Sequence, residues 1–148
     1  MIDLSELVPL GTALVLGGLI GLEREIHRKP AGLRTNILIC MAATVFTLLC
    51  QSFQTPDAES RVIQGVITGV GFLGAGALIY TQGNVHGMTT AATIWLVTAI
   101  GIACGLGRYQ TAVLTTILAL IVLWGLSPLD KRLSKSDRQK NAFSPPDE

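Results

Sequence analysis

Charged side chains are scarce in this sequence and are kept out of its longest apolar stretches. Charged residues make up 14% of the chain, against ~25% in soluble domains. Hydrophobic residues make up 49%, and the mean hydropathy is +0.53. Between Leu4 and Leu126, the stretches long enough to cross a bilayer contain at most one acid, Glu6. Because ~17–25 apolar residues span ~30 Å of hydrocarbon, this pattern excludes a water-soluble domain and predicts an integral membrane protein.

Residue types that carry most enzyme chemistry are also few. The chain has two histidines and three cysteines, and the spacing between His27 and His86 does not fit a local zinc motif. No serine, threonine or cysteine has a base at motif distance, so neither catalysis nor a cofactor is predicted. The run Gly69–Gly74 matches G-x-G-x-x-G in letters, but it lies inside an apolar stretch without the strand–turn–helix context of a nucleotide site. Nucleic acid is not an expected partner.

Turn-forming residues divide the apolar sequence into five stretches of helical length. An all-α fold is therefore predicted, with five transmembrane helices in residues 1–128 and a charged, mostly disordered cytoplasmic tail in residues 129–148. Asp3 and Glu6 stand where a secretory signal would be basic, so the first helix is expected to be retained. The fourth and fifth stretches are separated by Gly107 and Arg108 alone, and one bent span there would leave four crossings. The predicted spans are Leu4–Leu22, Ile37–Phe53, Val62–Tyr80, Met88–Leu106 and Tyr109–Leu126.

The basic residues predict an orientation in the membrane. Nine of the eleven lysines and arginines lie in two regions, the first loop (24–34) and the tail (131–140), which five spans would place on the same side. Arg61 and Arg108 would lie on the other side. Since short cytoplasmic loops carry an excess of Lys and Arg, the N-terminus is expected outside and the C-terminus in the cytoplasm. Its first partner is thus the lipid bilayer.

Glycines are expected to mark close contacts between the helices. Three pairs of glycines stand four residues apart, a spacing that lets helix backbones approach closely in a membrane. The third span carries five glycines on two roughly opposite faces, which predicts that it is packed on both sides and lies centrally. The alternative is that glycine is simply common in membrane helices. The predicted packing glycines are Gly17, Gly21, Gly65, Gly69, Gly71, Gly74, Gly76, Gly101 and Gly105.

Two carboxylates directly after the first span require an explanation, because topology accounts only for the basic residues beside them. An unpaired carboxylate at the interface is costly, and Arg34 is expected at the depth of Glu23 on the next helix. A Glu23–Arg34 or Glu25–Arg34 ion pair would close the first loop over the cytoplasmic mouth of the bundle. The alternatives are a solvated charge cluster and, before the fourth span, a turn with threonine N-capping. The predicted polar cluster, a candidate for binding or gating, is Glu23, Glu25, Arg34, Asn84, His86, Thr89 and Thr90.

Five short motifs follow one another between residues 10 and 127. They are GLIGLERE (18–25), KPAGLRTN (29–36), GVGFLGAG (69–76), GMTTAATIW (87–95) and GIACG (101–105). In this order they resemble the MgtC/SapB family of bacterial inner-membrane proteins. The resemblance implies five membrane helices and a cytoplasmic C-terminus. Many members carry a soluble domain after the fifth helix, and this chain is expected to resemble the shorter, SapB-like branch.

The same resemblance implies a role in magnesium homeostasis, in adaptation to low Mg²⁺ and in virulence. Older descriptions of the family favour magnesium transport, whereas others favour modulation of the F-type ATP synthase and of other membrane proteins.

Three functions are compatible with the sequence. A non-catalytic regulator that contacts a membrane partner, or a second copy of itself through Gly17–Gly21 or Gly101–Gly105, fits the glycines and the absence of acids in the second to fifth spans. A transporter or channel for Mg²⁺ or another ion needs oxygen ligands along its path, and Glu23 and Glu25 are the candidates. A receptor for a small cytoplasmic ligand would require a concave, water-accessible cluster. The regulator is the favoured interpretation.

Overall fold

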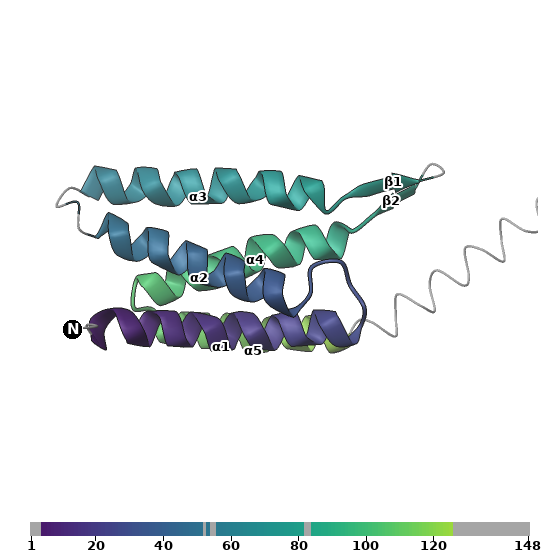
Figure 1. Ribbon diagram of the computed structural model, residues 1–148, viewed down its shortest axis with the longest axis horizontal. Coiled ribbons are helices and arrows are strands. Elements are labelled where there is room, and N and C mark those ends of the chain that lie inside the picture. Colours follow the sequence, from purple (N-terminus) through teal and green to yellow (C-terminus); the bar gives the residue numbers. More distant parts are fainter. Residues whose placement is uncertain (1–3, 52, 54–55, 82–83, 126–148) are drawn as a thin grey trace, which may run out of the picture.

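Five helices run in alternating directions along one axis in the computed structural model (Figure 1). The structure describes residues 4–51, 53, 56–81 and 84–125, so the predicted tail lies outside the described residues. The number of helices agrees with the prediction. The helices are α1 (Leu4–Ile26), α2 (Leu33–Cys50), α3 (Pro56–Gly76), α4 (Met88–Gly105) and α5 (Tyr109–Gly125), and a hairpin of β1 (Ile79–Thr81) and β2 (Asn84–His86) joins α3 to α4.

Three of these helices are long and apolar enough to cross a membrane. They are Glu6–Ile26 of α1, and the whole of α2 and α4. Helix α5 is apolar but has 17 residues. Helix α3 has 21 residues but begins with Asp57 and Glu59 in its first turn, with Arg61 close behind, and these charges lower its hydropathy. Length and composition therefore single out α1, α2 and α4.

The third predicted span differs most from the structure. It was expected to run to Tyr80, but α3 ends at Gly76 and the chain continues into the antiparallel pair β1–β2, in which Tyr80 faces Val85. Isoleucine, tyrosine and threonine follow one another in β1, and β-branched and aromatic residues favour strands over helices. The hairpin extends beyond the helices at the end of the bundle where α1 turns into α2 (Figure 1).

Helix α4, and not α3, is central in the bundle. It packs against each of the other four helices, and its Val97, Ile100 and Cys104 are buried in the main apolar core. The expectation of a central third span is wrong for this chain, because α3 lies at the edge (Figure 1). A Cβ added at Gly65 or Gly69 would meet nothing within 4 Å. The glycines of α3 therefore do not mark two packed faces.

Small residues and threonines join α2 to α4. Gly101 lies against the backbone of α2 at Cys40, and the hydroxyl of Thr44 donates to the carbonyls of both Cys40 and Gly101, at 2.9 Å each. Near the far end of α2, Gln51 Nε2 donates to the carbonyl of Gly105 at 2.8 Å. Glycine brings the two backbones close enough for these bonds, which satisfy polar groups that apolar surroundings would leave unpaired.

Candidate functional site

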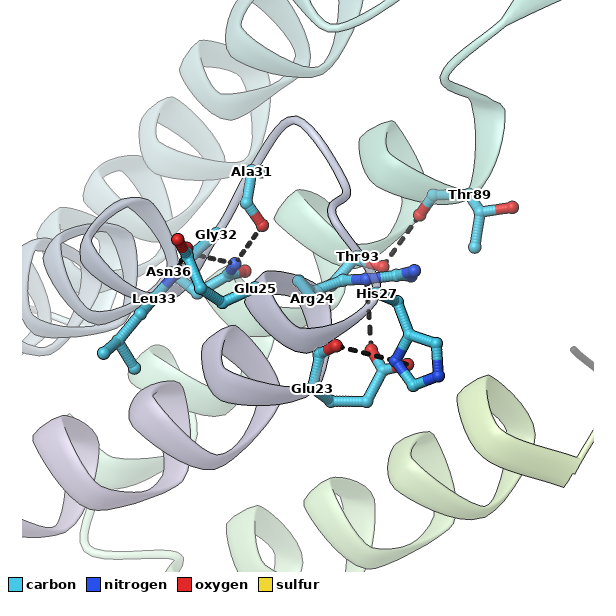
Figure 2. A network of polar contacts seen from close by, with 10 residues as sticks. All are labelled: Glu23, Arg24, Glu25, His27, Ala31, Gly32, Leu33, Asn36, Thr89 and Thr93. Carbon is cyan, nitrogen blue, oxygen red and sulfur yellow. Dashed lines mark hydrogen bonds and ion pairs between the residues drawn. The ribbon is translucent and has the colours of Figure 1, made fainter.

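A buried ion cluster lies at the end of α1 (Figure 2). Glu23 is 7% exposed and Arg24 is 3% exposed. One carboxylate oxygen of Glu23 lies 3.1 Å from Arg24 Nε, and the other lies 3.0 Å from His27 Nδ1. His27 Nδ1 also lies 2.9 Å from the main-chain carbonyl oxygen of Glu23. The carboxylate therefore contacts one residue of its own helix and the residue that directly follows that helix.

The backbone stops α1 directly behind this cluster. The N–H of Lys29 donates to the carbonyl of Arg24 at 2.9 Å, and the N–H of Arg28 donates to that of Glu25 at 3.0 Å. These two bonds form a Schellman motif, which requires a left-handed residue after the helix. Arg28 takes that place with φ 52°. The chain turns here and enters α2 within a few residues.

Glu25 and Asn36 hold the turn between α1 and α2. Glu25 Oε2 accepts from the N–H of Leu33 at 3.0 Å, and so satisfies one of the free donors at the start of α2. Asn36 is fully buried and its Nδ2 donates to the carbonyls of Ala31 and Gly32, at 2.8 Å each. Both side chains thus bind main-chain atoms of the loop.

Several buried polar atoms at this end have no hydrogen-bond partner within the described residues. They are Glu23 Oε2, Arg24 Nε and Nη1, and Asn36 Oδ1. Glu23 Oε2 and Arg24 Nε are within ion-pair distance of each other without hydrogen-bond geometry. In the view of Figure 2 the Arg24 side chain extends from α1 toward Thr93 of α4. Burying polar atoms without hydrogen-bond partners costs free energy, so these atoms reduce the net stability that the cluster contributes.

The start of α4 carries the predicted threonines. Gly87 precedes the helix with φ 92°, a left-handed conformation that L side chains rarely adopt. Thr89 is exposed and Thr90 is buried. The hydroxyl of Thr93 donates to the carbonyl of Thr89 at 2.7 Å. No side-chain cap is formed at Gly87, so the proposed N-capping by threonine does not occur there.

The structure brings together only part of the predicted polar cluster. Arg34 is exposed, and the described residues contain no ion pair between Arg34 and either Glu23 or Glu25. The predicted ion pair is therefore not formed, because Glu23 pairs with Arg24 and His27 instead. Glu25 and Arg34 do line the same polar depression. His86 is exposed on β2, where Asn84 also lies, and this hairpin extends beyond the ends of the helices (Figure 1).

Three polar residues at this end of the bundle, Arg24, His27 and Asn36, are not in the predicted polar cluster. In the sequence, topology alone explains Arg24, His27 has no zinc ligand at motif distance, and Asn36 is one letter of a motif. An i, i+4 pairing of Glu23 with His27 on one helix was the available signal. Among the described residues no three histidine, cysteine or acidic side chains lie close enough to hold a metal ion.

The predicted glycine contacts divide into two groups. A Cβ at Gly17 would lie 2.8 Å from Cys40 Cβ, and one at Gly21 would lie 2.8 Å from Leu33 Cα. A Cβ at Gly101 or Gly105 would lie even closer to atoms of α2. These faces are occupied inside the chain, so they are not free for the second copy that was considered there. Gly65, Gly69, Gly71 and Gly76 have open space, while Gly74 is in ordinary contact with Ala91.

Three helices of the bundle are long and apolar enough to cross a membrane, and an ion cluster is buried at one end. These features are those of a helical membrane protein. Residues 10–132 match the family model described as the MgtC family. The chain belongs to the MgtC family.

Proteins named MgtC align with most of this chain. Protein MgtC of Salmonella typhimurium is 41% identical over 120 residues, which are 81% of this chain and 52% of that protein. Protein MgtC of Brucella abortus is 38% identical over 136 residues, which are 92% of this chain and 57% of that protein. The chain thus spans about half the length of the curated relatives it matches. No solved structure matches it.

Proposed function

We propose that this chain is a five-span protein of the bacterial inner membrane, with its N-terminus outside and its C-terminus in the cytoplasm. In this proposal it is a non-catalytic regulator of other membrane proteins in adaptation to low Mg²⁺, and it does not itself carry an ion. Membership of the MgtC family supports the link to magnesium. Because the chain covers about half of those relatives, its activity and partners are proposed from its own geometry.

The burial and contacts of Glu23 favour a regulator over a transporter. An ionisable residue that serves an ion path faces a water-filled cavity, whereas the Glu23 carboxylate is buried and contacts Arg24 and His27. Deeper in the bundle the core between α1 and α4 is apolar, with Leu16, Ile20 and Val97. An Mg²⁺ ion, which keeps oxygen ligands and several waters, would find neither along this route.

The outer face of α3 offers a contact surface for a partner. Gln64, Thr68, Gly71 and Ala75 are spaced to lie on one side of this helix, and all four are exposed. We call them the α3 outer face. Small and polar side chains are the residues through which membrane helices associate, and the amide of Gln64 is a costly group to present to lipid. A partner helix would cover both.

The arrangement of the helices supports the proposed topology. Because the helices alternate in direction, the loop between α1 and α2, the β1–β2 hairpin and the end of α5 lie at the same end of the bundle (Figure 1). Exposed Arg28, Lys29 and Arg34 lie at that end, while Arg108 lies at the other. This distribution is the one that the positive-inside rule associates with a cytoplasmic face.

Flux through purified protein tests the first half of the proposal. The chain and its Glu23→Gln variant would be placed in liposomes that contain a Mg²⁺-sensitive dye, and an Mg²⁺ gradient would be applied. We expect both to leave the dye signal at the level of empty liposomes. Flux through the native chain that disappears in Glu23→Gln would replace the regulator with a transporter.

Photocrosslinking in native membranes tests the second half. A benzophenone side chain at Thr68 of the α3 outer face is expected to capture a discrete partner protein, which would be probed first for subunits of the F-type ATP synthase. The matched control is the same group at Leu114, an exposed residue of α5, where lipid adducts alone are expected. Thr68→Phe should then remove growth support in low Mg²⁺. Equal capture at both positions would contradict a specific partner surface.

A further inference from the structure

An apolar groove runs between α2 and α3. It has a volume of about 520 Å³, within the ~300–1,000 Å³ typical of ligand pockets. Leu38 and Phe46 of α2 form one wall, and Gly65, Gly69 and Leu73 of α3 form the other. The two glycines deepen the groove, because a Cβ at either would meet nothing within 4 Å. This face of α3 is distinct from the α3 outer face.

The groove leads to a polar depression at the turn between α1 and α2. It shares Leu38 and Leu73 with a second apolar depression of about 590 Å³. That second depression shares Pro30 and Thr35 with the polar one, which Arg34 lines. The groove and the polar depression are therefore neighbours, and the cation Arg34 lies at this end of the groove.

The charge at this end of the groove is predominantly positive. Arg28 and Lys29 are exposed in the turn between α1 and α2, and Arg34 is exposed in the first turn of α2. Glu25 also lines the polar depression, but its Oε2 already accepts the N–H of Leu33 at 3.0 Å. Three cations and one carboxylate give this end a net positive charge, which favours a ligand that carries an anionic group.

The length and lining of the groove suit one acyl chain. At ~1.5 Å per residue, the α3 wall from Val62 to Leu73 is ~16 Å long, close to the ~15 Å of one bilayer leaflet. The lining is almost entirely apolar, and a hydrocarbon chain fills such a groove without leaving a buried polar group unpaired.

We infer that the α2–α3 groove holds one acyl chain of an anionic phospholipid whose phosphate lies beside Arg34. The inference rests on the proposed membrane location, with this end at the cytoplasmic leaflet, where anionic lipids attract basic residues. It requires neither a protein partner nor an ion gradient. The bound lipid would also attach α3, the helix at the edge, to α2.

Native mass spectrometry of the full chain in a non-ionic detergent tests this inference. The chain would be titrated with phosphatidylglycerol and with phosphatidylcholine of identical acyl chains. We expect one retained phosphatidylglycerol. Arg34→Gln should weaken phosphatidylglycerol about fivefold, the change that loss of one surface cation produces, and weaken phosphatidylcholine less, because its choline cation offsets the charge of its phosphate. Gly69→Leu, which fills the groove, should weaken both lipids at least tenfold.

Matched variants separate the groove from general effects. Gly11→Leu adds the same side chain to α1 at a glycine that also has open space, and Arg108→Gln removes a cation at the other end of the bundle; neither should change lipid binding. Circular dichroism and elution volume check that Gly69→Leu folds, and Gly65→Leu repeats the test at a second position.

Several results would overturn the inference. One is unchanged lipid retention in Gly69→Leu and Gly65→Leu with native helicity. Another is equal retention of both lipids that Arg34→Gln leaves unaltered. Competition by free glycerol phosphate without a chain would show a simple phosphate site. A dimer mass in the native chain that Gly69→Leu abolishes would assign the groove to a second copy. Because the assay contains no partner, a failed regulator hypothesis leaves these results unaffected, and the reverse also holds.

Discussion

At the scale of single residues, the ion cluster of α1 combines two opposite charges with little access to water. Glu23 and Arg24 are both buried, and their charged atoms lie 3.1 Å apart. Such a pair adds little stability overall, since desolvation offsets the attraction, but removing one partner leaves a buried charge without compensation. The cluster is therefore most sensitive to changes that affect one charge alone.

Glu23→Gln should destabilise the chain by about 3 kcal/mol, because Arg24 would remain buried without its counterion. Chemical unfolding in detergent, followed by circular dichroism, measures the change. Glu25→Gln is the matched control, since this exposed carboxylate contacts a single main-chain N–H, and its replacement should cost about 1 kcal/mol. Equal losses in the two variants would show that burial at Glu23 has no energetic consequence.

Asn36→Ala should cost about 2 kcal/mol, because its amide is the donor to two loop carbonyls and buried acceptors without partners are expensive. The unfolding assay applies here as well, and hydrogen exchange should increase in residues 27–33. Thr35→Ala, at the exposed neighbouring position, should stay within about 0.5 kcal/mol of the native chain. A stable Asn36→Ala chain would mean that water replaces the amide.

The sequence identified Glu23 as an acid in need of a partner, but it did not identify the partner. Arg34 lies at a comparable depth, yet residues two apart on a helix point in nearly opposite directions. Asn36 is the one buried at this end of α2, and Arg34 is exposed. Which face of α2 meets α1 depends on packing, and the weak amphipathicity of an apolar helix does not reveal it.

At the scale of the elements, glycines with the same spacing perform different tasks. Gly17 and Gly21 let α1 touch the backbone of α2, whereas Gly65 and Gly69 border an open groove. The two pairs have the same spacing in the sequence. That spacing shows that one face of the helix lacks side chains, but it does not show what packs against that face. For this reason the close α1–α2 contact was predictable, and the edge position of α3 was not.

Gly21→Ala should destabilise the bundle by about 1–3 kcal/mol, the usual cost of overpacking, because its Cβ would lie 2.8 Å from Leu33 Cα and 2.9 Å from Leu33 O. Gly11→Ala is the matched control in the same helix. With open space around it, alanine there should stabilise the chain by up to about 1 kcal/mol through its higher helix propensity. Thermal unfolding in detergent measures both, and a shift in the same direction would contradict the close approach.

At the scale of the whole molecule, α3 decides the topology. Charge counting predicted five spans, and the part of the chain that the structure describes has five helices in alternating directions. The number of helices was predictable because apolar length and turn residues are local signals. Whether α3 crosses is a balance between its apolar middle and Asp57, Glu59 and Arg61 near its start, and its neighbours in the bundle contribute to that balance as much as its own composition.

Three single cysteines should resolve this balance. The native Cys40, Cys50 and Cys104 are buried, whereas Lys29, His86 and Arg108 are exposed and are separated by α2 with α3, and then by α4. If α3 crosses, Lys29→Cys and His86→Cys should react with a membrane-impermeant maleimide from the cytoplasmic side, and Arg108→Cys from outside. If α3 does not cross, Lys29→Cys and Arg108→Cys should share one side and His86→Cys the other. The first pattern is expected, because α2 and α4 run in the same direction through the bundle, so that the chain must return along α3 between them.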